Sequence, residues 1–353
     1  MKSSKNDFLE IITAKELLNK LLLSQIQRKS IPLGTVAQKT QWHQIETWID
    51  AHGLSNLFLY ACDEKNIIPD QTMQKWQTLQ MQFMFKNLKF LKAGDYLFSI
   101  LEASGINAVA MRGLTLLNKN YAEPWMRAMG DIDILIHKQD HVRFFETLKK
   151  HDIEPVETFR SQYVYHIQNL KTEIHWSFIT AKRYRKKIDT SHFIDTRSLV
   201  KTKDGSFFCL SNENELIGLI THAFIHHELS ILKQLFDIAL FMAIDDIDWH
   251  YIANWCHHAK LSRMFVFTIH LVGSLFKLDV SDIVNHFKIV FPKQKQKVVE
   301  TYVESFFKTR ISQLIPRKNN MLYIAENPFT KLEQFINFFS MTEAKDVYIR
   351  YFK

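Results

Sequence analysis

Glycine and proline, the residues that most often form turns, are scarce in this sequence. The 353 residues include only 9 Gly and 7 Pro, beside 28 Phe. A sandwich or barrel of many short strands needs frequent turns, and turns are built largely from these two residue types. The composition therefore favours long helices, and we expect the chain to be mostly helical.

The length and charge of the chain limit the kinds of protein that it can be. A chain of 353 residues exceeds the usual size of one globular core, so two or three packed units are expected. Hydrophobic residues make up 46% and charged residues 23%, which is typical of soluble globular domains. The net charge of +8 suits an anionic ligand such as a nucleotide or nucleic acid, although ordinary surfaces also have an excess of lysine.

Cysteine usage and hydropathy point to a soluble protein of the cytoplasm. Cys62, Cys209 and Cys256 lie far apart without CxxC spacing, so neither a disulfide framework nor a zinc knuckle is indicated. Charged residues interrupt the N-terminus, which lacks the apolar core of a signal peptide. No window approaches the ~20 apolar residues that cross a bilayer. We expect no membrane partner.

The spacing of the apolar residues changes twice along the chain. It is helical up to about residue 104, mixed from 105 to 210, and helical again from 211 onward. We therefore expect an α+β protein in three units: an N-terminal helical unit over 1–104, an α/β core with a small mixed sheet over 105–210, and a C-terminal helical unit over 211–353. A last helix is expected over 329–339.

Short apolar and β-rich segments within residues 105–210 predict strands. The expected strands are 108–111, 132–136, 163–167 and 173–176, with helices over 114–121 and 140–150 between them. The alternation of strands and helices is typical of a mixed α/β unit.

Asp131 and Asp133 form an acidic pair at the start of one predicted strand. Residues two apart on a strand point to the same face, so Ile132 enters the core while both carboxylates leave it. Like charges this close repel each other, and a divalent cation resolves the repulsion. Mg²⁺ prefers oxygen ligands, usually one or two carboxylates plus substrate phosphates. Two such ions ~4 Å apart could promote an in-line displacement at phosphorus.

A third carboxylate and a phosphate seat complete the predicted site. Glu173 is the candidate for the third carboxylate, on a strand where it shares a face with His175. Gly113 stands where a strand turns into a helix, and there the absence of a Cβ lets backbone amides approach phosphate oxygens. Arg112 and Arg127 are candidate phosphate clamps. Each feature alone is common on ordinary surfaces and in ordinary turns, but their order along the chain is much less so.

In this order the residues resemble an uncharacterised bacterial nucleotidyltransferase family of the DNA polymerase β-like superfamily. Its members read Lys-Gly, an apolar helix ending in Tyr, Arg, and then an Asp-hydrophobic-Asp strand. The corresponding residues here are Arg112-Gly113, Tyr121, Arg127 and Asp131 to Ile136. The family's later His-Trp step and its helical His, His, Asp pattern match His175-Trp176, His222, His226 and Asp237. The resemblance covers approximately residues 106–276.

The resemblance implies a mixed sheet of five or fewer strands and transfer of a nucleoside monophosphate from an NTP. Asp131, Asp133 and Glu173 would hold two Mg²⁺ ions, with Glu173 also polarising the acceptor hydroxyl as a base. Contacts to the nucleotide are implied for Arg112, Gly113, Thr115, Arg127, His175, His222, His226 and Asp237. Two positions depart from the pattern. Arg112 replaces Lys, and a Gly-Ser pair of the superfamily reads Gly113-Leu114 here, so a hydroxyl contact to the γ-phosphate would come from Thr115 or not at all.

Several alternatives remain open at this point. The chain could be a catalytically inert descendant that binds a nucleotide or a partner protein, whereas a nuclease or phosphodiesterase is disfavoured because no His-Asp pair stands at the acidic strand. Zinc at His222, His226 and His227 is less favoured than a nucleotide contact or a structural tie to Asp237. A basic cluster after Glu173 is either a solvated loop or a triphosphate or RNA contact: Lys182, Arg183, Arg185, Lys186 and Lys187. Nothing selects among protein, RNA and small-molecule acceptors.

Overall fold

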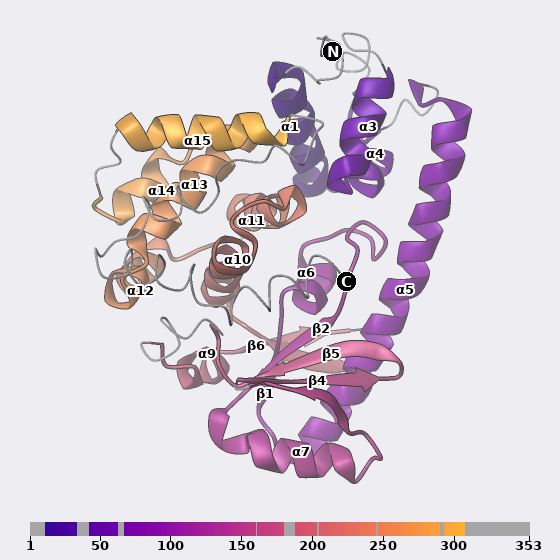
Figure 1. Ribbon diagram of the computed structural model, residues 1–353, viewed down its shortest axis with the longest axis vertical. Coiled ribbons are helices and arrows are strands. Elements are labelled where there is room, and N and C mark those ends of the chain that lie inside the picture. The colour runs from indigo at the N-terminus through magenta and orange to yellow at the C-terminus, as the bar shows by residue number, and fades with distance from the viewer. Residues whose placement is uncertain are drawn as a thin grey trace, which may run out of the picture.

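The computed structural model describes residues 11–33, 42–62, 67–159, 161–179, 188–202, 205–244, 246–289 and 293–307. The expected helix over 329–339 and the basic cluster within 182–187 lie outside the described residues. The expected α+β class is confirmed, with one mixed sheet among many helices (Figure 1).

Four described helices precede the sheet. They are α1 (Ile11–Gln27), α3 (Trp42–His52), α4 (Ser55–Ala61) and α5 (Asp70–Ala103). Pro69 immediately precedes α5, where its fixed φ and missing N–H are tolerated. The apolar stripe of α1 is buried, including Leu17, Leu18 and Leu21. The helical period of the sequence therefore predicts this part of the fold correctly.

The sheet has seven strands in the order β3-β4-β5-β2-β1-β7-β6. Their bounds are β1 (Ala108–Met111), β2 (Ile132–Ile136), β3 (Pro155–Thr158), β4 (Gln162–Ile167), β5 (Leu170–His175), β6 (Ser198–Lys201) and β7 (Ser206–Cys209). The pairs β2–β5 and β1–β7 are parallel, and the other pairs are antiparallel.

The expectation of five strands or fewer is wrong, because edge strands extend the sheet on both sides. β3 is largely exposed, so its sequence lacks the apolar alternation that marks a half-buried strand. β6 and β7 are only four residues each and add a hairpin beside β1. The strands expected over 108–111 and 132–136 have the predicted bounds, while β4 and β5 are longer than expected.

The two faces of the sheet have different coverings. Ile132, Ile134 and Ile136 are fully buried on one face. Helix α7 (His141–Lys149) packs on this face, with the Phe144 and Tyr165 ring centroids 5.9 Å apart. The residues that alternate with these isoleucines along β2 point to the opposite face of the sheet. That face carries the acidic residues.

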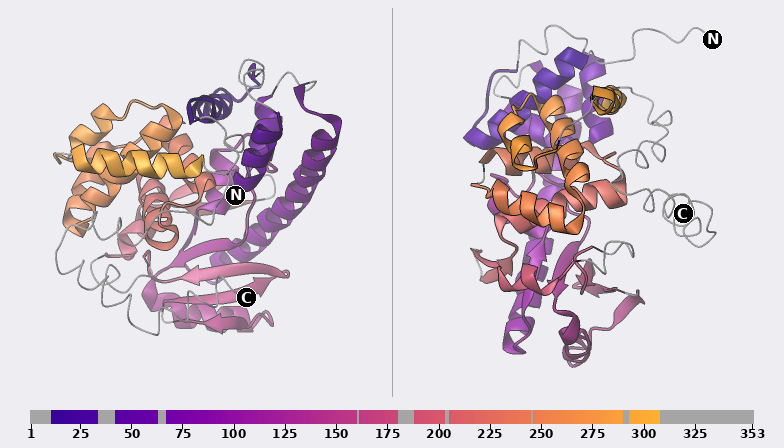
Figure 2. Two further views of the ribbon diagram at one scale, coloured as in Figure 1. Left: turned by 45° about the horizontal axis from the view of Figure 1, so that its top comes forward. Right: turned by 90° about the vertical axis from the view of Figure 1, so that its left-hand side faces the viewer.

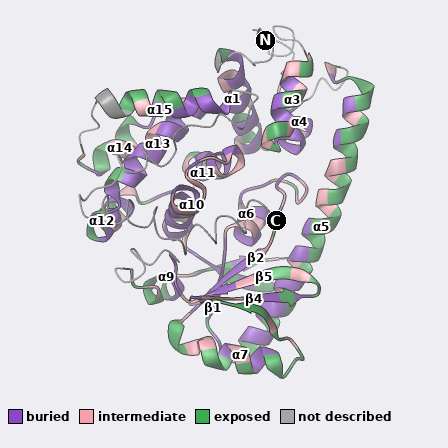
Figure 3. Ribbon diagram, viewed as in Figure 1, coloured by how far each residue is buried: buried purple, intermediate pink, exposed green. Residues whose placement is uncertain are grey.

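Helices after the sheet form most of the remaining core. They are α10 (Asn212–His227), α11 (Leu232–Ile244), α12 (Trp249–Ala259), α13 (Ser262–Phe276), α14 (Ser281–His286) and α15 (Lys293–Phe306), after a short α9 (Ser191–Asp195). Figure 3 shows buried positions concentrated in the inner strands and in α10 and α11. None of the described helices combines the length and the hydropathy needed to cross a bilayer.

The helices before and after the sheet are in direct contact. The Asn19 side chain of α1 donates to the Phe276 carbonyl over 2.8 Å, and the Trp48 indole of α3 donates to the Phe306 carbonyl over 2.8 Å. Figure 2 shows these two groups of helices side by side. The unit boundaries at residues 104 and 210 stay a prediction.

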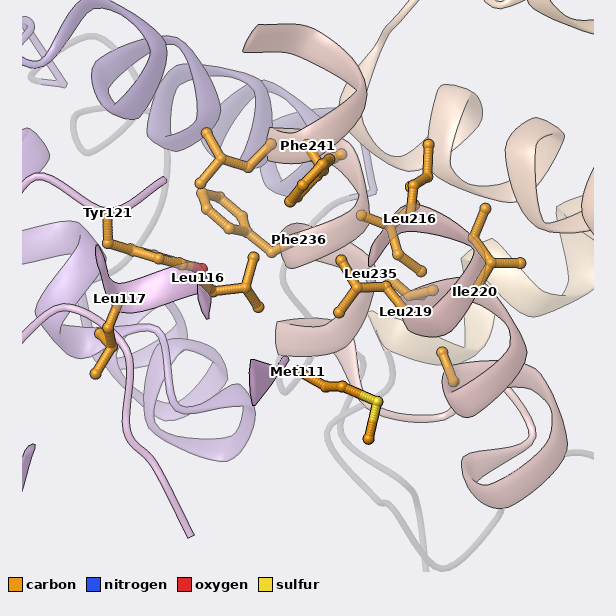
Figure 4. Packing of buried hydrophobic residues seen from close by; sticks show 14 of the residues in the cluster. Met111, Leu116, Leu117, Tyr121, Leu216, Leu219, Ile220, Leu235, Phe236 and Phe241 are labelled. Atoms are coloured by element: carbon orange, nitrogen blue, oxygen red, sulfur yellow. The ribbon is translucent and has the colours of Figure 1, made fainter. Parts of the chain in front are cut away.

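One apolar core fixes the end of β1 against the helices that follow the sheet. Met111 at the end of β1 and Leu116 of α6 (Gly113–Lys119) lie close to Leu216 of α10 and to Leu235 and Phe236 of α11 (Figure 4). All five side chains are almost completely buried. The turn between β1 and α6 is therefore held by packing on both sides.

Candidate active site

Asp133 and Glu173 lie side by side on neighbouring strands. β2 and β5 are parallel, and Asp133 pairs with Glu173 in their register, so both carboxylates leave the same face. His175 is two residues farther along β5 and shares this face. One ligand atom from each of Asp133, Glu173 and His175 lies within 4.8 Å of the others. The strand parity that the sequence predicts thus brings these three side chains together.

Asp133 is the most deeply buried carboxylate of this group. It is 7% exposed and accepts hydrogen bonds from Arg112 Nη1 at 2.8 Å and His175 Nε2 at 3.1 Å. The expectation that no His-Asp pair stands at the acidic strand is therefore wrong, because the neighbouring strand β5 supplies the histidine. Burial opposes its ionisation, but the Arg112 charge and the His175 hydrogen bond hold the pKa of Asp133 well below its usual range. Asp133 is therefore ionised at neutral pH.

Asp131 immediately precedes β2 and lies at the rim of the site. Burial raises its pKa, and the charges of Asp133 and Glu173 raise it further. Lys171 Nζ lies 3.5 Å from Asp131 Oδ2 and also pairs with Glu173. Three carboxylates that repel one another around a lysine form a site that favours a cation.

The donor set fits a hard divalent ion. Carboxylate oxygens such as those of Asp133 and Glu173 are the ligands that Mg²⁺ prefers, and it commonly keeps room for phosphate oxygens and water. His175 Nε2 lies 3.1 Å from Asp133 Oδ1 and 3.5 Å from Glu173 Oε2, so the imidazole orients both carboxylates. Asp131 is not part of the group formed by Asp133, Glu173 and His175. It is a further candidate ligand at the rim of the site.

The turn after β1 has an unusual backbone conformation. Arg112 has φ 55° and ψ −115°, a region that favours glycine and costs another residue about 1–3 kcal/mol. Its carbonyl accepts the first hydrogen bond of α6, from Leu116 N at 2.8 Å. Its amide donates to Glu215 Oε1 at 2.6 Å, while its guanidinium pairs with Asp133. This turn connects the acidic residues to α10.

Gly113 lies where two segments approach each other closely. A Cβ at this position would lie 3.2 Å from Met129 Cε and 3.3 Å from Arg127 Nη1. These distances are shorter than ordinary van der Waals contacts, so a larger residue would require the Met129 and Arg127 side chains to shift by a few tenths of an ångström. Gly113 thus lets the Arg127 guanidinium lie beside the turn.

Arg127 and Asp237 form a buried ion pair. Asp237 is fully buried and accepts from Arg127 Nε at 2.9 Å, from Arg127 Nη2 at 2.9 Å and from the Tyr121 hydroxyl at 2.7 Å. Burial is the largest single influence and lowers the pKa of Arg127, but the charge and hydrogen bonds of Asp237, with smaller contributions from Tyr121 and Asp131, together raise it. The structure therefore places Asp237 differently from the expected nucleotide contact: it anchors Arg127, whose Nη1 faces the Gly113 turn.

Thr115 also lies away from its expected place. The side chain is fully buried, and its hydroxyl donates to the Ala110 carbonyl at 3.2 Å. The reason is its position in the first turn of α6, where the side chain points back toward the end of β1. The hydroxyl is directed into the core and is not presented to a phosphate.

His222 and His226 lie on α10 with their ring centroids 5.2 Å apart. His227 Nε2 is 3.1 Å from His222 Nε2, so one ring donates and the other accepts. Burial and then the Arg112 charge lower the pKa of His222 well below its usual value, which favours a neutral ring beside the site. Among the described residues, the group with the spacing of a metal site is the one around Asp133, and these histidines are not part of it.

Three polar residues near the site have no clear signal in the sequence. Lys171 bridges two of the carboxylates. Lys233 of α11 donates to the Ala128 carbonyl at 3.0 Å, and burial lowers its pKa to about 8. Glu215 occupies the first turn of α10, where an acidic residue is ordinary because of the helix dipole. Only the tertiary structure shows that it is fully buried.

Glu215 makes a testable contribution to the pH dependence of stability. Burial raises the pKa of its carboxyl from the ordinary 4.5 to about 7. The folded protein then binds this proton more tightly than the unfolded chain, so the group stabilises the fold less as pH rises from about 4.5 to about 7. We expect the free energy of unfolding of wild type, relative to Glu215→Gln, to fall over this range in urea denaturation. A relative value independent of pH would contradict the assignment.

A family model described as "Uncharacterised nucleotidyltransferase" matches residues 38–277, which is more than half of the chain. The match begins well before residue 106, where the motifs begin, so it also includes α3, α4 and α5. No curated protein matches the chain.

Two solved structures are similar to this chain. The solution structure of the antibiotic-resistance factor ANT(2'')-Ia has 8% identity and a TM-score of 0.33, with 57% of this chain and 98% of that chain covered. A crystal structure of an antigenic nucleotidyltransferase-like protein from Paracoccidioides brasiliensis has 17% identity and a TM-score of 0.32, with 53% and 91% covered.

Proposed function

The chain belongs to the family described as uncharacterised nucleotidyltransferases, and from this premise we propose a Mg²⁺-dependent transfer of a nucleoside monophosphate from an NTP to a hydroxyl acceptor. The observation that supports the metal site best is the register pair of Asp133 and Glu173, with Asp131 at the rim. The acceptor is a hydroxyl of a protein, an RNA or a small molecule.

The acidic residues have distinct roles in the proposed reaction. Asp131 and Asp133 would hold two Mg²⁺ ions and Glu173 would complete the metal site. When bound, the ions neutralise charge that develops on the phosphate oxygens. The acceptor oxygen forms a bond to the α-phosphorus, the bond to the bridging oxygen of the β-phosphate breaks, and pyrophosphate leaves. Glu173 accepts the proton of the acceptor hydroxyl.

Basic residues around the turn after β1 would seat the triphosphate. Arg112 Nη1 lies 2.8 Å from Asp133 Oδ1, and Arg127 Nη1 lies beside Gly113, so the two guanidinium groups flank the turn after β1. Lys233 adds a third cation from α11. His222 and His226 stay candidates for nucleotide contacts from α10.

A catalytically inert, nucleotide-binding regulator is the second candidate. The buried hydroxyl of Thr115 favours it, because the superfamily's hydroxyl contact to the γ-phosphate then has no counterpart in this turn.

Incubation with α-labelled NTPs and Mg²⁺ distinguishes the two candidates. The label would be followed into protein, RNA and small-molecule fractions of a cell extract. Covalent transfer of label is the result that we expect. Stable binding of Mg²⁺ and NTP without transfer would support the inert candidate, and an absence of binding would contradict both.

Lys171→Met is expected to tighten the binding of Mg²⁺ in the absence of nucleotide. The Lys171 ammonium lies 3.5 Å from Asp131 Oδ2 and opposes a second cation by repulsion. Because the side chain is 45% exposed, the gain should be at most ~1 kcal/mol, or roughly fivefold in affinity. Calorimetric titration with Mg²⁺ measures it, with the exposed Lys201→Met as the matched control. Weaker binding by Lys171→Met would contradict a cation site at these carboxylates.

A further inference from the structure

The backbone at Arg112 needs an external restraint. Its φ of 55° and ψ of −115° belong to a region that residues with a Cβ rarely adopt, and such outliers persist only when the surrounding structure holds them. The packing of Met111 on one side of the turn is apolar and does not fix the direction of the Arg112 amide. A directional contact is therefore needed.

Glu215 provides this contact from a distant part of the chain. Its Oε1 accepts the Arg112 amide proton at an N–O distance of 2.6 Å. The carboxyl is 0% exposed, so no water competes for the hydrogen bond. Leu216, the next residue of α10, belongs to the same buried core as Met111, the residue before Arg112 (Figure 4).

The second oxygen of Glu215 indicates a function beyond folding. Oε2 is buried and has no hydrogen-bond partner among the described atoms. A buried, incompletely satisfied carboxyl lowers stability, and such groups are retained where they have a role in a site. Asp133, whose partner is the Arg112 side chain, is also near enough to raise the pKa of Glu215.

We propose that Glu215 is a positioning residue for the proposed triphosphate seat, acting through the backbone of Arg112. By fixing the Arg112 amide it holds the turn in the conformation that directs the guanidinium to Asp133 and starts α6 at Gly113. Glu215 does not itself contact the nucleotide. This inference rests on the proposed nucleotidyltransferase function, which supplies the ligand.

A double-mutant cycle between residues 112 and 215 tests the proposal. Glycine adopts the φ of Arg112 without strain, so in the Arg112→Gly background the restraint becomes dispensable. We expect Glu215→Leu to weaken the binding of Mg²⁺ with a non-hydrolysable NTP analogue roughly tenfold or more. We expect Glu215→Gln, which keeps a hydrogen-bond acceptor, to retain most of the wild-type affinity. In Arg112→Gly protein the Glu215→Leu effect should shrink to about threefold or less.

Two controls separate the proposal from general destabilisation. Glu213→Leu removes a carboxylate from the same first turn of α10 and should leave nucleotide affinity unchanged. Hydrogen exchange of the Arg112 amide reports on the turn without any ligand, and we expect protection in wild type that is lost in Glu215→Leu. If Glu215→Leu does not fold, Glu215→Gln takes its place in the cycle. We then expect a smaller loss of nucleotide affinity, which again disappears in Arg112→Gly protein.

The outcomes identify which claim fails. A Glu215→Leu effect of equal size with Arg112 or Gly at position 112 would overturn the proposal, because Glu215 would then act on the ligand directly. Faster exchange at the turn with unchanged affinity would overturn it as well. Wild-type protein that binds neither Mg²⁺ nor nucleotide, but in which Glu215 protects the Arg112 amide from exchange, would instead contradict the proposed function.

Discussion

Asp133→Asn is expected to slow nucleotidyl transfer by a factor of about 10³ or more, because it removes a charge that the proposed metal site needs in the transition state. The amide keeps the shape of the side chain and can still accept a hydrogen bond from Arg112. The loss should therefore appear in kcat and in metal affinity while the fold is retained. Transfer of α-labelled nucleotide under saturating Mg²⁺ and NTP measures the rate.

The same substitution at an exposed aspartate is the matched control. Asp152 follows α7 and is exposed with φ 57°, a conformation that asparagine also tolerates. Asp152→Asn should transfer at the wild-type rate. If Asp133→Asn protein retained transfer within twofold of wild type, Asp133 could not be a metal ligand in the reaction.

Asp237→Ala is expected to lower the free energy of unfolding by about 3–5 kcal/mol, because it leaves the buried Arg127 charge without its partner. The Tyr121 hydroxyl also loses its acceptor. Urea denaturation followed by circular dichroism measures the change. The Arg127→Met/Asp237→Ala protein should be more stable than Asp237→Ala alone, since no unpaired charge remains buried.

A partly exposed ion pair provides the comparison for Asp237. Arg143 Nη2 lies 3.0 Å from Asp140 Oδ1, and the side chains of Arg143 and Asp140 are 52% and 14% exposed. Water can hydrate the Arg143 charge when its partner is removed. Asp140→Ala should therefore change the free energy of unfolding by less than about 1 kcal/mol. If Asp237→Ala lowered the free energy of unfolding by no more than Asp140→Ala does, the pair of Arg127 and Asp237 would not anchor the segment before β2.

The sequence predicts the parts of the site that depend on strand parity. The alternation over 132–136 correctly separates the buried isoleucines from Asp133, and the same reasoning places Glu173 and His175 on one face of β5. That the two strands are neighbours in parallel register is a property of the sheet topology, which parity alone does not determine. Strand parity therefore predicts that Asp133 and Glu173 lie close together only when the order of the strands is also known.

Contacts between distant segments could not be predicted from local patterns. Arg127 and Asp237 lie 110 positions apart, and nothing near either residue indicates that their charges meet in the core. Glu215 has the position of an ordinary acidic residue in a first helical turn, while its burial depends on the packing of α10 against the end of β1. The exposed strand β3 has no alternation from which it could be found.

Diffraction from crystals grown with Mn²⁺ and a non-hydrolysable NTP analogue tests the central claim most directly, because Mn²⁺ takes the oxygen sites of Mg²⁺ and has an anomalous signal. We expect anomalous density between the carboxylates of Asp133 and Glu173, with Asp131 as a further ligand and the triphosphate beside Arg112 and Gly113. Anomalous density away from these carboxylates, with Asp133 still paired only to Arg112 and His175, would contradict the account.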